Sequence, residues 1–306
     1  MLKQLRSLVG PLVGLVAINV VFVALAPTYR QPEAWRDILE QSAVLLIMAT
    51  GTTLALIGGQ LDLSVGSILA LVSVVTGSLL FGGLPVWVCV LGGLAAGVLC
   101  GLINGLVIVA SGIPTLVATL GMMMAARGVA NMVGMGKDMS RFPDAFKWLG
   151  AGFVGPIVIT VLAVVVMWFI LSKTRLGFNA YAIGGNREVA RLSGIPVKFN
   201  IVIIYIISGL TAGLAAIVQT ARLDFATPNR GQGMELWVIA ATVIGGTSMF
   251  GGVGGVGRTI IGVLIIKSLQ AGLIHLHVQS FWQQVAIGVV IVVAVWIDTL
   301  QRRERA

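Results

Sequence analysis

The sequence predicts an all-α, polytopic integral membrane protein. Hydrophobic residues make up 58% of the 306 residues and charged residues only 10%, and the mean hydropathy is +1.02. No water-soluble globular domain has this composition. The apolar runs are long, whereas the strands of a transmembrane barrel alternate over only about 10 residues. We therefore expect helices that span the membrane, arranged as a single transmembrane domain over residues 1–306.

A spanning helix needs about 20 mostly apolar residues, because the hydrocarbon core is ~30 Å thick and each helical residue rises ~1.5 Å. The segment at 236–252 is short and interrupted by glycines, so it is either a span or a re-entrant element. We therefore expect about ten spanning helices, within a range of eight to ten. The first apolar run exceeds that of a secretory signal peptide, and we expect it to be retained. The candidate spans are 8–26, 42–58, 65–81, 84–109, 113–135, 152–171, 201–220, 236–252, 256–275 and 279–297.

The net charge of +9 would suggest a nucleic-acid partner in a soluble protein, so the position of the basic residues has to decide. If the N-terminus is cytoplasmic, ten spans place eleven Lys and Arg in inside segments and seven in outside loops. This bias follows the positive-inside rule. The most basic inside segment, 172–200, has few aromatic side chains on which bases would stack. We expect an inner (plasma) membrane protein that contacts the lipid bilayer, with both termini in the cytoplasm and no nucleic-acid partner.

The sequence lacks the residue patterns of an enzyme. It has no Gly-x-x-x-x-Gly-Lys-Ser/Thr loop for nucleotide phosphates. A metal site needs three or four convergent ligands, and His275 and His277 have no Cys, Asp or Glu cluster near them in the sequence. We expect no catalytic residue, no metal and no cofactor in this chain.

Two glycine-rich breaks interrupt the apolar runs, and both open with Ile-Gly-Gly, at 57–66 and at 244–252. Their similarity suggests an internal duplication, as in many transporter folds. Non-helical backbone at membrane depth survives only inside protein or beside water. The breaks therefore either lie by a translocation path or are tight connections at the cytoplasmic surface. The candidate path residues are Gly59, Asp62, Ser64, Gly66, Gly245, Gly246 and Thr247.

Three charged residues lie within or between the apolar runs. An ionised carboxylate at Asp62 is costly in lipid unless it is hydrated or paired. We expect Ser64 to cap the following helix and Asp62 to sit near its positive N-terminal end, ahead of direct contact with a solute. Arg127 and Lys267 lie within spans, and we expect them to snorkel or to pair internally.

The chain resembles permeases of the ribose-type (monosaccharide) branch of ATP-binding cassette importers, the inner-membrane components of binding-protein-dependent transport systems. The residues that carry this resemblance are distributed in order along the sequence, so coincidence is a poor explanation. They lie at 59–66, 118–123, 127–128, 174–177, 181–186, 191–195 and 243–248.

The resemblance implies a complex of two permease subunits, cytoplasmic ATPase subunits that bind the ATP, and an outside solute-binding protein. This chain would be one permease subunit, paired with itself or with a close relative. The segment 172–200 would be the ATPase-coupling loop, with a short helix around 187–193 docked in a cleft of the ATPase. A solvated basic loop that only fixes the topology is the alternative. The coupling residues are Arg187, Glu188, Ala190, Arg191 and Gly194; Glu188 and Arg191 are three apart and so share a face.

The sequence leaves the solute open. A pentose or hexose is expected first, and a permease for a branched-chain amino acid, nucleoside or signalling sugar derivative is the nearest alternative. A secondary carrier would need a coupling-ion site built from intramembrane acids, and only Asp62 is available. A membrane enzyme would need a nucleophile–base or metal constellation. Polar or stacking contacts with the solute would come from side chains that also fit packing roles: Asn104, Asn131, Gln219 and Trp237.

Overall fold

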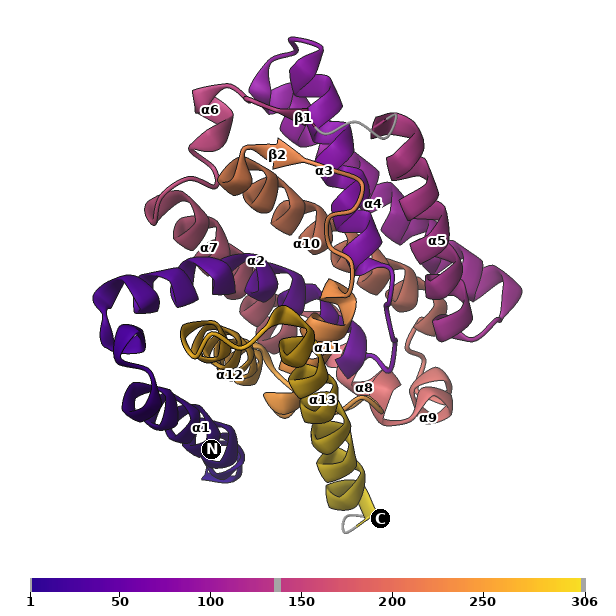
Figure 1. Cartoon of the computed structure of the whole chain (residues 1–306). Helices are drawn as coiled ribbons and strands as arrows, with labels where there is room; N and C mark the ends of the chain where they lie inside the picture. The colour runs from indigo at the N-terminus through magenta and orange to yellow at the C-terminus, as the bar shows by residue number, and fades with distance from the viewer. Residues whose placement is uncertain (1, 135–138, 304–306) are drawn as a thin grey trace.

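The computed structural model describes residues 2–134 and 139–303, which form a bundle of helices with one short two-stranded sheet (Figure 1). This architecture confirms the all-α prediction. The two strands are antiparallel, with Met139 opposite Ala226. The elements in chain order are α1 (Leu2–Leu25), η1 (Pro27–Arg30), α2 (Pro32–Ile57), α3 (Val65–Phe81), α4 (Val86–Ser111), α5 (Thr115–Gly134), β1 (Met139–Ser140), α6 (Asp144–Lys147), α7 (Val154–Lys173), α8 (Arg175–Gly185), α9 (Arg187–Leu192), α10 (Val197–Leu223), β2 (Phe225–Ala226), α11 (Met234–Ile244), α12 (Val256–His275) and α13 (Ser280–Arg303).

Among the described residues, six helices are long and apolar enough to cross a membrane by length and composition: α2, α4, α5, α7, α10 and α12. Four apolar stretches are shorter, namely Val9–Leu25 in α1, all of α3, all of α11, and Phe281–Val290 in α13. Each of the ten candidate spans therefore overlaps one apolar helix, and the end of the span 113–135, at residue 135, lies outside the described residues.

Helix α11 is shorter than the span predicted at 236–252, so that boundary is wrong. The helix has 11 residues, and at ~1.5 Å per residue it is only ~16 Å long. It ends because Gly245 and Gly246 follow, and Gly246 has a φ of 98°, a conformation that glycine adopts without steric cost. The chain then stays non-helical until Val256. The short, re-entrant alternative fits this element better than a full span.

Helix α10 runs through the centre of the bundle and contacts α2, α3 and α4. Small residues let its backbone approach that of α4, a common arrangement between membrane helices. A β-carbon at Gly97 would overlap the carbonyl group of Gly209, and one at Gly101 would overlap that of Tyr205. The side chain of Tyr205 is fully buried, and its hydroxyl donates to the carbonyl oxygen of Leu61 at 3.2 Å. The central helix is thereby fixed against the first glycine-rich break.

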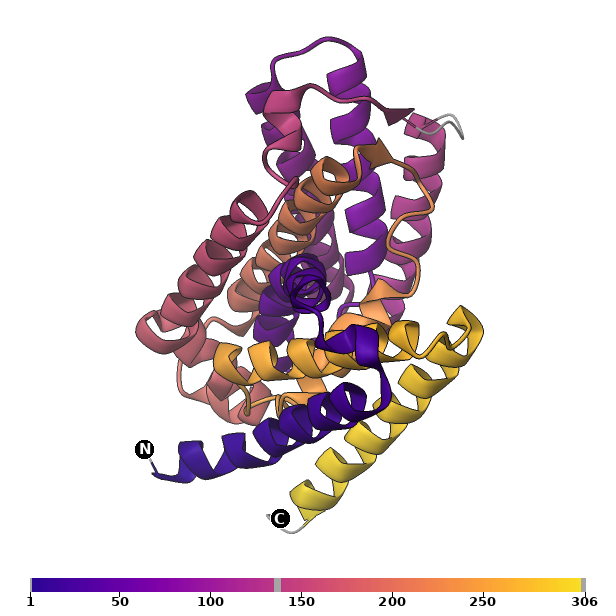
Figure 2. The ribbon, with the colours of Figure 1, turned by 60° about the vertical axis from the view of Figure 1, so that its left-hand side comes forward.

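Helix α1 packs along α12 (Figure 2). The ring of Phe22 occupies the space that a side chain at Gly272 would need. In η1, the buried Tyr29 donates from its hydroxyl to Oδ1 of Asn19 at 2.7 Å, and its ring stands edge-on to that of His275 at 5.7 Å. His275 therefore has a packing role where η1 meets α12.

Candidate functional site

The basic segment 172–200 is mostly helical. Helix α7 ends at Lys173, α8 follows at once, and α9 comes after the single residue Asn186. The short helix predicted around 187–193 is confirmed as α9. The sequence reasoning missed α8, because its 11 residues include three glycines and glycine is a poor helix former.

Side-chain caps fix where these two helices begin. Oγ1 of Thr174 accepts from the backbone N–H of Gly177 at 3.4 Å. Oδ1 of Asn186 accepts from the backbone N–H groups of Glu188 and Val189 at 3.0 Å each. Asn is a preferred residue at this position, because its side chain satisfies N–H groups that the helix leaves unpaired. Asn186 therefore ends α8 and starts α9 in a fixed direction.

Helix α9 presents both charged and apolar side chains at the surface. Glu188 and Arg191 share one face as predicted, and Nε of Arg191 donates to Oε2 of Glu188 at 3.2 Å. This hydrogen bond holds the pKa of Glu188 below its ordinary value. The side chains of Val189 and Leu192 are 56% and 75% exposed, and the sequence reasoning did not select them. Both belong to a helix of only six residues.

The other residues selected in this segment have distinct positions. Arg187 is exposed at the first position of α9, and Ala190 faces inward and is buried. Gly194 has a φ of 81° and ends α9, where the N–H of Ile195 donates to the carbonyl oxygen of Ala190 at 3.1 Å. A residue with a β-carbon is strained at this φ.

Helices α2 and α11 end in the same glycine-based cap, which explains the repeated Ile-Gly-Gly. In each, the second glycine has a positive φ, 67° for Gly59 and 98° for Gly246. The backbone hydrogen bonds around each pair of glycines form a Schellman motif, which satisfies the last carbonyl groups of a helix. The bonds are Gly59 N–H to Leu56 O at 2.9 Å and Gln60 N–H to Ala55 O at 2.9 Å, and Gly246 N–H to Val243 O at 2.8 Å and Thr247 N–H to Thr242 O at 3.1 Å.

Helix α8 packs directly on both breaks. A β-carbon at Gly184 would overlap the carbonyl oxygen of Ile57, at the end of α2, and crowd the backbone nitrogen of Gly252, in the second break. The N–H of Gly252 itself donates to the carbonyl oxygen of Ile57 at 2.8 Å. The hydroxyl of Tyr181 donates to the carbonyl oxygen of Gly254 at 3.0 Å. Three segments that are far apart in the sequence thus meet backbone to backbone at one point.

Asp62 is buried in a network of hydrogen bonds that links the first break to α10. Its Oδ1 accepts from the backbone N–H of Ser64 at 2.9 Å and from the Ser64 hydroxyl at 2.6 Å. Its Oδ2 accepts from the hydroxyl of Ser208 at 2.7 Å. Nδ2 of Asn104, on α4, donates to the Ser64 hydroxyl at 2.9 Å. Asp62 therefore lies just before the first turn of α3, with both carboxylate oxygens hydrogen-bonded within the protein.

The expected cap by Ser64 is wrong. Ser64 occupies the position before α3, but its side chain accepts no hydrogen bond from the first turn of that helix. Its hydroxyl instead donates to the carboxylate of Asp62 and accepts from Nδ2 of Asn104.

The remaining residues of the breaks serve close packing. A β-carbon at Gly66 would overlap the carbonyl oxygen of Gly231 and the carboxylate of Glu235, so α3 approaches the chain before α11 closely. One at Gly245 would overlap the carbonyl oxygen of Arg258, on α12. Oγ1 of Thr247 is buried and has no hydrogen-bond partner among the described residues.

Arg127 makes contacts other than an ion pair. Its Nη1 donates to the carbonyl oxygens of Pro228 and Arg230 at 2.6 Å each. The side chain therefore ties α5 to the segment before α11. Asn131, one turn further on, donates to the carbonyl oxygen of Arg127 at 2.9 Å, as a packing residue does.

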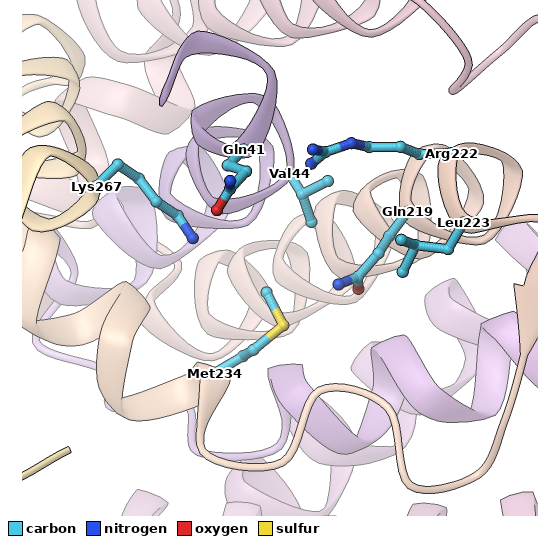
Figure 3. A pocket seen from close by; sticks show the side chains of 7 residues that line it. All are labelled: Gln41, Val44, Gln219, Arg222, Leu223, Met234 and Lys267. Atoms are coloured by element: carbon cyan, nitrogen blue, oxygen red, sulfur yellow. The ribbon is translucent and has the colours of Figure 1, made fainter. Parts of the chain in front are cut away.

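A cavity of about 240 Å³ with a mixed polar and apolar lining lies between α2, α10, α11 and α12 (Figure 3). None of the candidate path residues in the two breaks lines it. Of the residues singled out in the sequence, Gln219 and Lys267 do. The lining residues are Gln41, Val44, Gln219, Arg222, Leu223, Met234 and Lys267.

Lys267 forms no internal ion pair among the described residues, and its expected snorkelling stays a prediction. Its Nζ donates to Oε1 of Gln270 at 3.0 Å and lies 6.0 Å from the centre of the Trp237 ring. Oε1 of Gln219 is buried and has no hydrogen-bond partner among the described residues. Sequence reasoning missed Gln41 and Arg222, although polar side chains at the ends of apolar helices were a usable signal.

Comparison with known proteins identifies the family. The family model described as branched-chain amino acid transport system / permease component matches residues 35–295. The chain is 38% identical over 292 residues to the D-allose transport system permease protein of Escherichia coli K12, covering 94% of this chain and 90% of that protein. It is 38% identical over 295 residues to the ribose import permease protein of Bacillus subtilis 168, covering 94% and 92%.

The L-arabinose ABC transporter permease protein of Azospirillum brasilense is 34% identical over 300 residues, covering 95% of this chain and 88% of that protein. No solved structure matches the chain. The family model and these relatives cover nearly the whole sequence, and the resemblance to ribose-type importer permeases is confirmed. The chain is therefore a multi-pass membrane permease that belongs to this transport-system permease family.

Proposed function

We propose that this chain is the membrane permease subunit of an ATP-driven importer for a monosaccharide. The observation that carries the proposal is the match to sugar permeases over more than nine-tenths of the chain. The description of the family model refers to branched-chain amino acids, but the full-length relatives are permeases for ribose, allose and arabinose. A pentose or hexose is therefore the better supported solute.

The subunit would act with three kinds of partner. An ATPase subunit in the cytoplasm would bind and hydrolyse the ATP, an outside binding protein would deliver the sugar, and a second permease subunit would complete the path. Both chain ends lie toward the end of the bundle that carries α8 and α9 (Figures 1 and 2). This placement supports a cytoplasmic position for both termini and for the coupling segment.

The proposed coupling runs from α9 through α8 to the two breaks. Closure of the ATPase pair would push α9, and α9 is joined to α8 by Asn186 alone. Because Gly184 contacts both Ile57 and Gly252 without an intervening side chain, a shift of α8 toward the breaks would push on at least one of them. The bundle would thereby switch between outward-open and inward-open states.

The proposal is tested by purifying the permease from its native membrane in mild detergent and identifying the proteins bound to it. We expect an ATPase subunit and vanadate-sensitive ATP hydrolysis in the preparation. Proteoliposomes that contain this complex and the binding protein should take up labelled monosaccharide only when ATP is present. Active uptake by the permease alone, without any ATPase, would instead establish a secondary carrier.

Replacing Leu192 with aspartate should detach the ATPase and abolish ATP-driven uptake. The side chain is 75% exposed on α9, so the change leaves the fold intact but places a charge on the apolar part of the proposed docking surface. Pull-down of the ATPase with the purified variant measures the effect. The control is Leu84→Asp, at another exposed leucine, in the turn between α3 and α4. Retention of the ATPase by Leu192→Asp, or equal loss in both variants, would refute docking through α9.

A further inference from the structure

The cavity between α2, α10, α11 and α12 is lined by four polar and three apolar side chains. Of its seven lining residues, two are amides and two are cations, and none is acidic. In Figure 3 the polar ends of Gln41, Gln219 and Lys267 point toward the space between the helices, and Arg222 extends across its upper edge. Both charged groups in the cavity lining are therefore cations, and the lining offers several hydrogen-bond donors.

Neither cation of the lining forms an ion pair in the part of the chain that the structure describes. Among the residues that the structure describes, the ion pairs are formed by other side chains, and neither Arg222 nor Lys267 has an acidic partner within ion-pair distance. Arg222 lies in the last turn of α10, where the helix dipole favours a cation. Lys267 has no such support in the interior of α12. A cation within an apolar helix is costly and usually marks a solute or ion pathway.

The groups that line the cavity complement a ligand with one carboxylate and several hydroxyls. Guanidinium and ammonium groups form their strongest hydrogen bonds with carboxylates. The buried Oε1 of Gln219, which lacks a partner among the described residues, is an acceptor for a hydroxyl donor. A neutral sugar would use the amides but leave both cations unpaired.

We propose that this cavity binds the carboxylate form of a monosaccharide, a sugar acid, with Lys267 and Arg222 on the carboxylate and Gln219 on a ring hydroxyl. The inference rests on the proposed function, because it names the solute class and the binding residues of the same permease. It goes beyond that function because it assigns part of the selection among sugars to this chain, in addition to the selection made by a binding protein.

The test measures sugar binding to the full-length permease in lipid nanodiscs, by saturation-transfer NMR with competition. The probes are two matched pairs, D-galacturonate with D-galactose and D-glucuronate with D-glucose, which differ only at the sixth carbon. We expect at least one acid to bind about tenfold or more tightly than its neutral partner, as one charge-assisted hydrogen bond provides. This preference should shrink as the salt concentration rises.

Variants of Lys267 test whether the preference for the acid over the neutral sugar arises in the cavity. Lys267→Gln should weaken binding of the acid about tenfold and leave binding of the neutral sugar unchanged, while Lys267→Arg should keep the preference. Lys147→Gln is the matched control, because that lysine pairs with Asp144 on α6, outside the cavity. The Lys147→Gln variant should bind the acid and the neutral sugar as tightly as the wild type does.

The inference is overturned if the neutral sugars bind as tightly as the acids, if no acid binds, or if Lys267→Gln leaves the preference intact. If ATP-driven uptake of a neutral monosaccharide is observed together with any of these outcomes, the proposed function holds and only the sugar-acid inference fails. Absence of both ATPase association and uptake of any sugar would contradict the proposed function itself.

Discussion

Replacing Gly184 with alanine should abolish ATP-driven uptake and destabilise the permease by about 3 kcal/mol, at the upper end of what overpacking usually costs. The added β-carbon would overlap the carbonyl oxygen of Ile57 and crowd the backbone nitrogen of Gly252. Because both obstacles are backbone atoms, no rotamer change relieves the overlap, and α8 must move away from both breaks. Thermal unfolding in detergent and uptake in proteoliposomes measure the two effects.

The neighbouring Gly185 provides a control that differs by one position. A β-carbon there meets no atom within 4 Å, and alanine is a better helix former than glycine by about 1 kcal/mol. Gly185→Ala should therefore keep full uptake and leave the melting temperature unchanged or slightly higher. Similar behaviour of the two variants would mean that the contact between α8 and the breaks contributes nothing to coupling.

Replacing Asp62 with alanine should lower the free energy of unfolding by about 3 kcal/mol. The change removes the acceptor for the backbone N–H of Ser64 and for the Ser208 hydroxyl, and both donors are buried. Chemical denaturation of the detergent-solubilised permease measures the loss. Asp62→Asn should have a smaller effect of the same sign, because the amide keeps one of the two acceptor oxygens.

Two comparisons test whether Asp62 acts through structure. Asp144→Ala removes a carboxylate that is 97% exposed, and surface changes of this kind cost at most about 0.5 kcal/mol. The ratio of uptake between two sugars should be unchanged in Asp62→Asn, since Asp62 does not line the cavity. A changed sugar preference at wild-type stability would show that Asp62 contacts the solute.

The two kinds of prediction separate coupling from recognition within one chain. Gly184 and Leu192 belong to the end of the bundle where α8 packs on the breaks and α9 follows it. Lys267 and Gln219 belong to the cavity between α10 and α12. Variants in the first group should affect ATP-driven uptake of every sugar alike, whereas variants in the second should affect the choice among sugars.

Features that depend on neighbouring residues could be predicted from the sequence. The ten apolar runs indicated the helices, because burial in lipid requires continuous stretches of apolar side chains. Helix α9 was predictable since Glu188 and Arg191 are three apart, and Asn186 and Gly194 cap its two ends. The Ile-Gly-Gly repeats likewise marked two real helix ends, and the caps use hydrogen bonds that span at most five residues.

Features that depend on distant segments required the tertiary structure. The contact of Gly184 with Ile57 and Gly252 joins three parts of the chain, and nothing local distinguishes Gly184 from Gly185. The role of Ser64 was mispredicted for the same reason, because its partners include Asn104 on another helix.

By itself the sequence determined the class of protein, the apolar runs that form most of its long helices and the short helix α9, because hydrophobic length, helix caps and charge spacing are local properties. Only the tertiary structure decided which side chains face one another across the bundle. Gln41, Gln219, Arg222 and Lys267 come from three helices, and a cavity between helices exists only once their packing has fixed which faces meet.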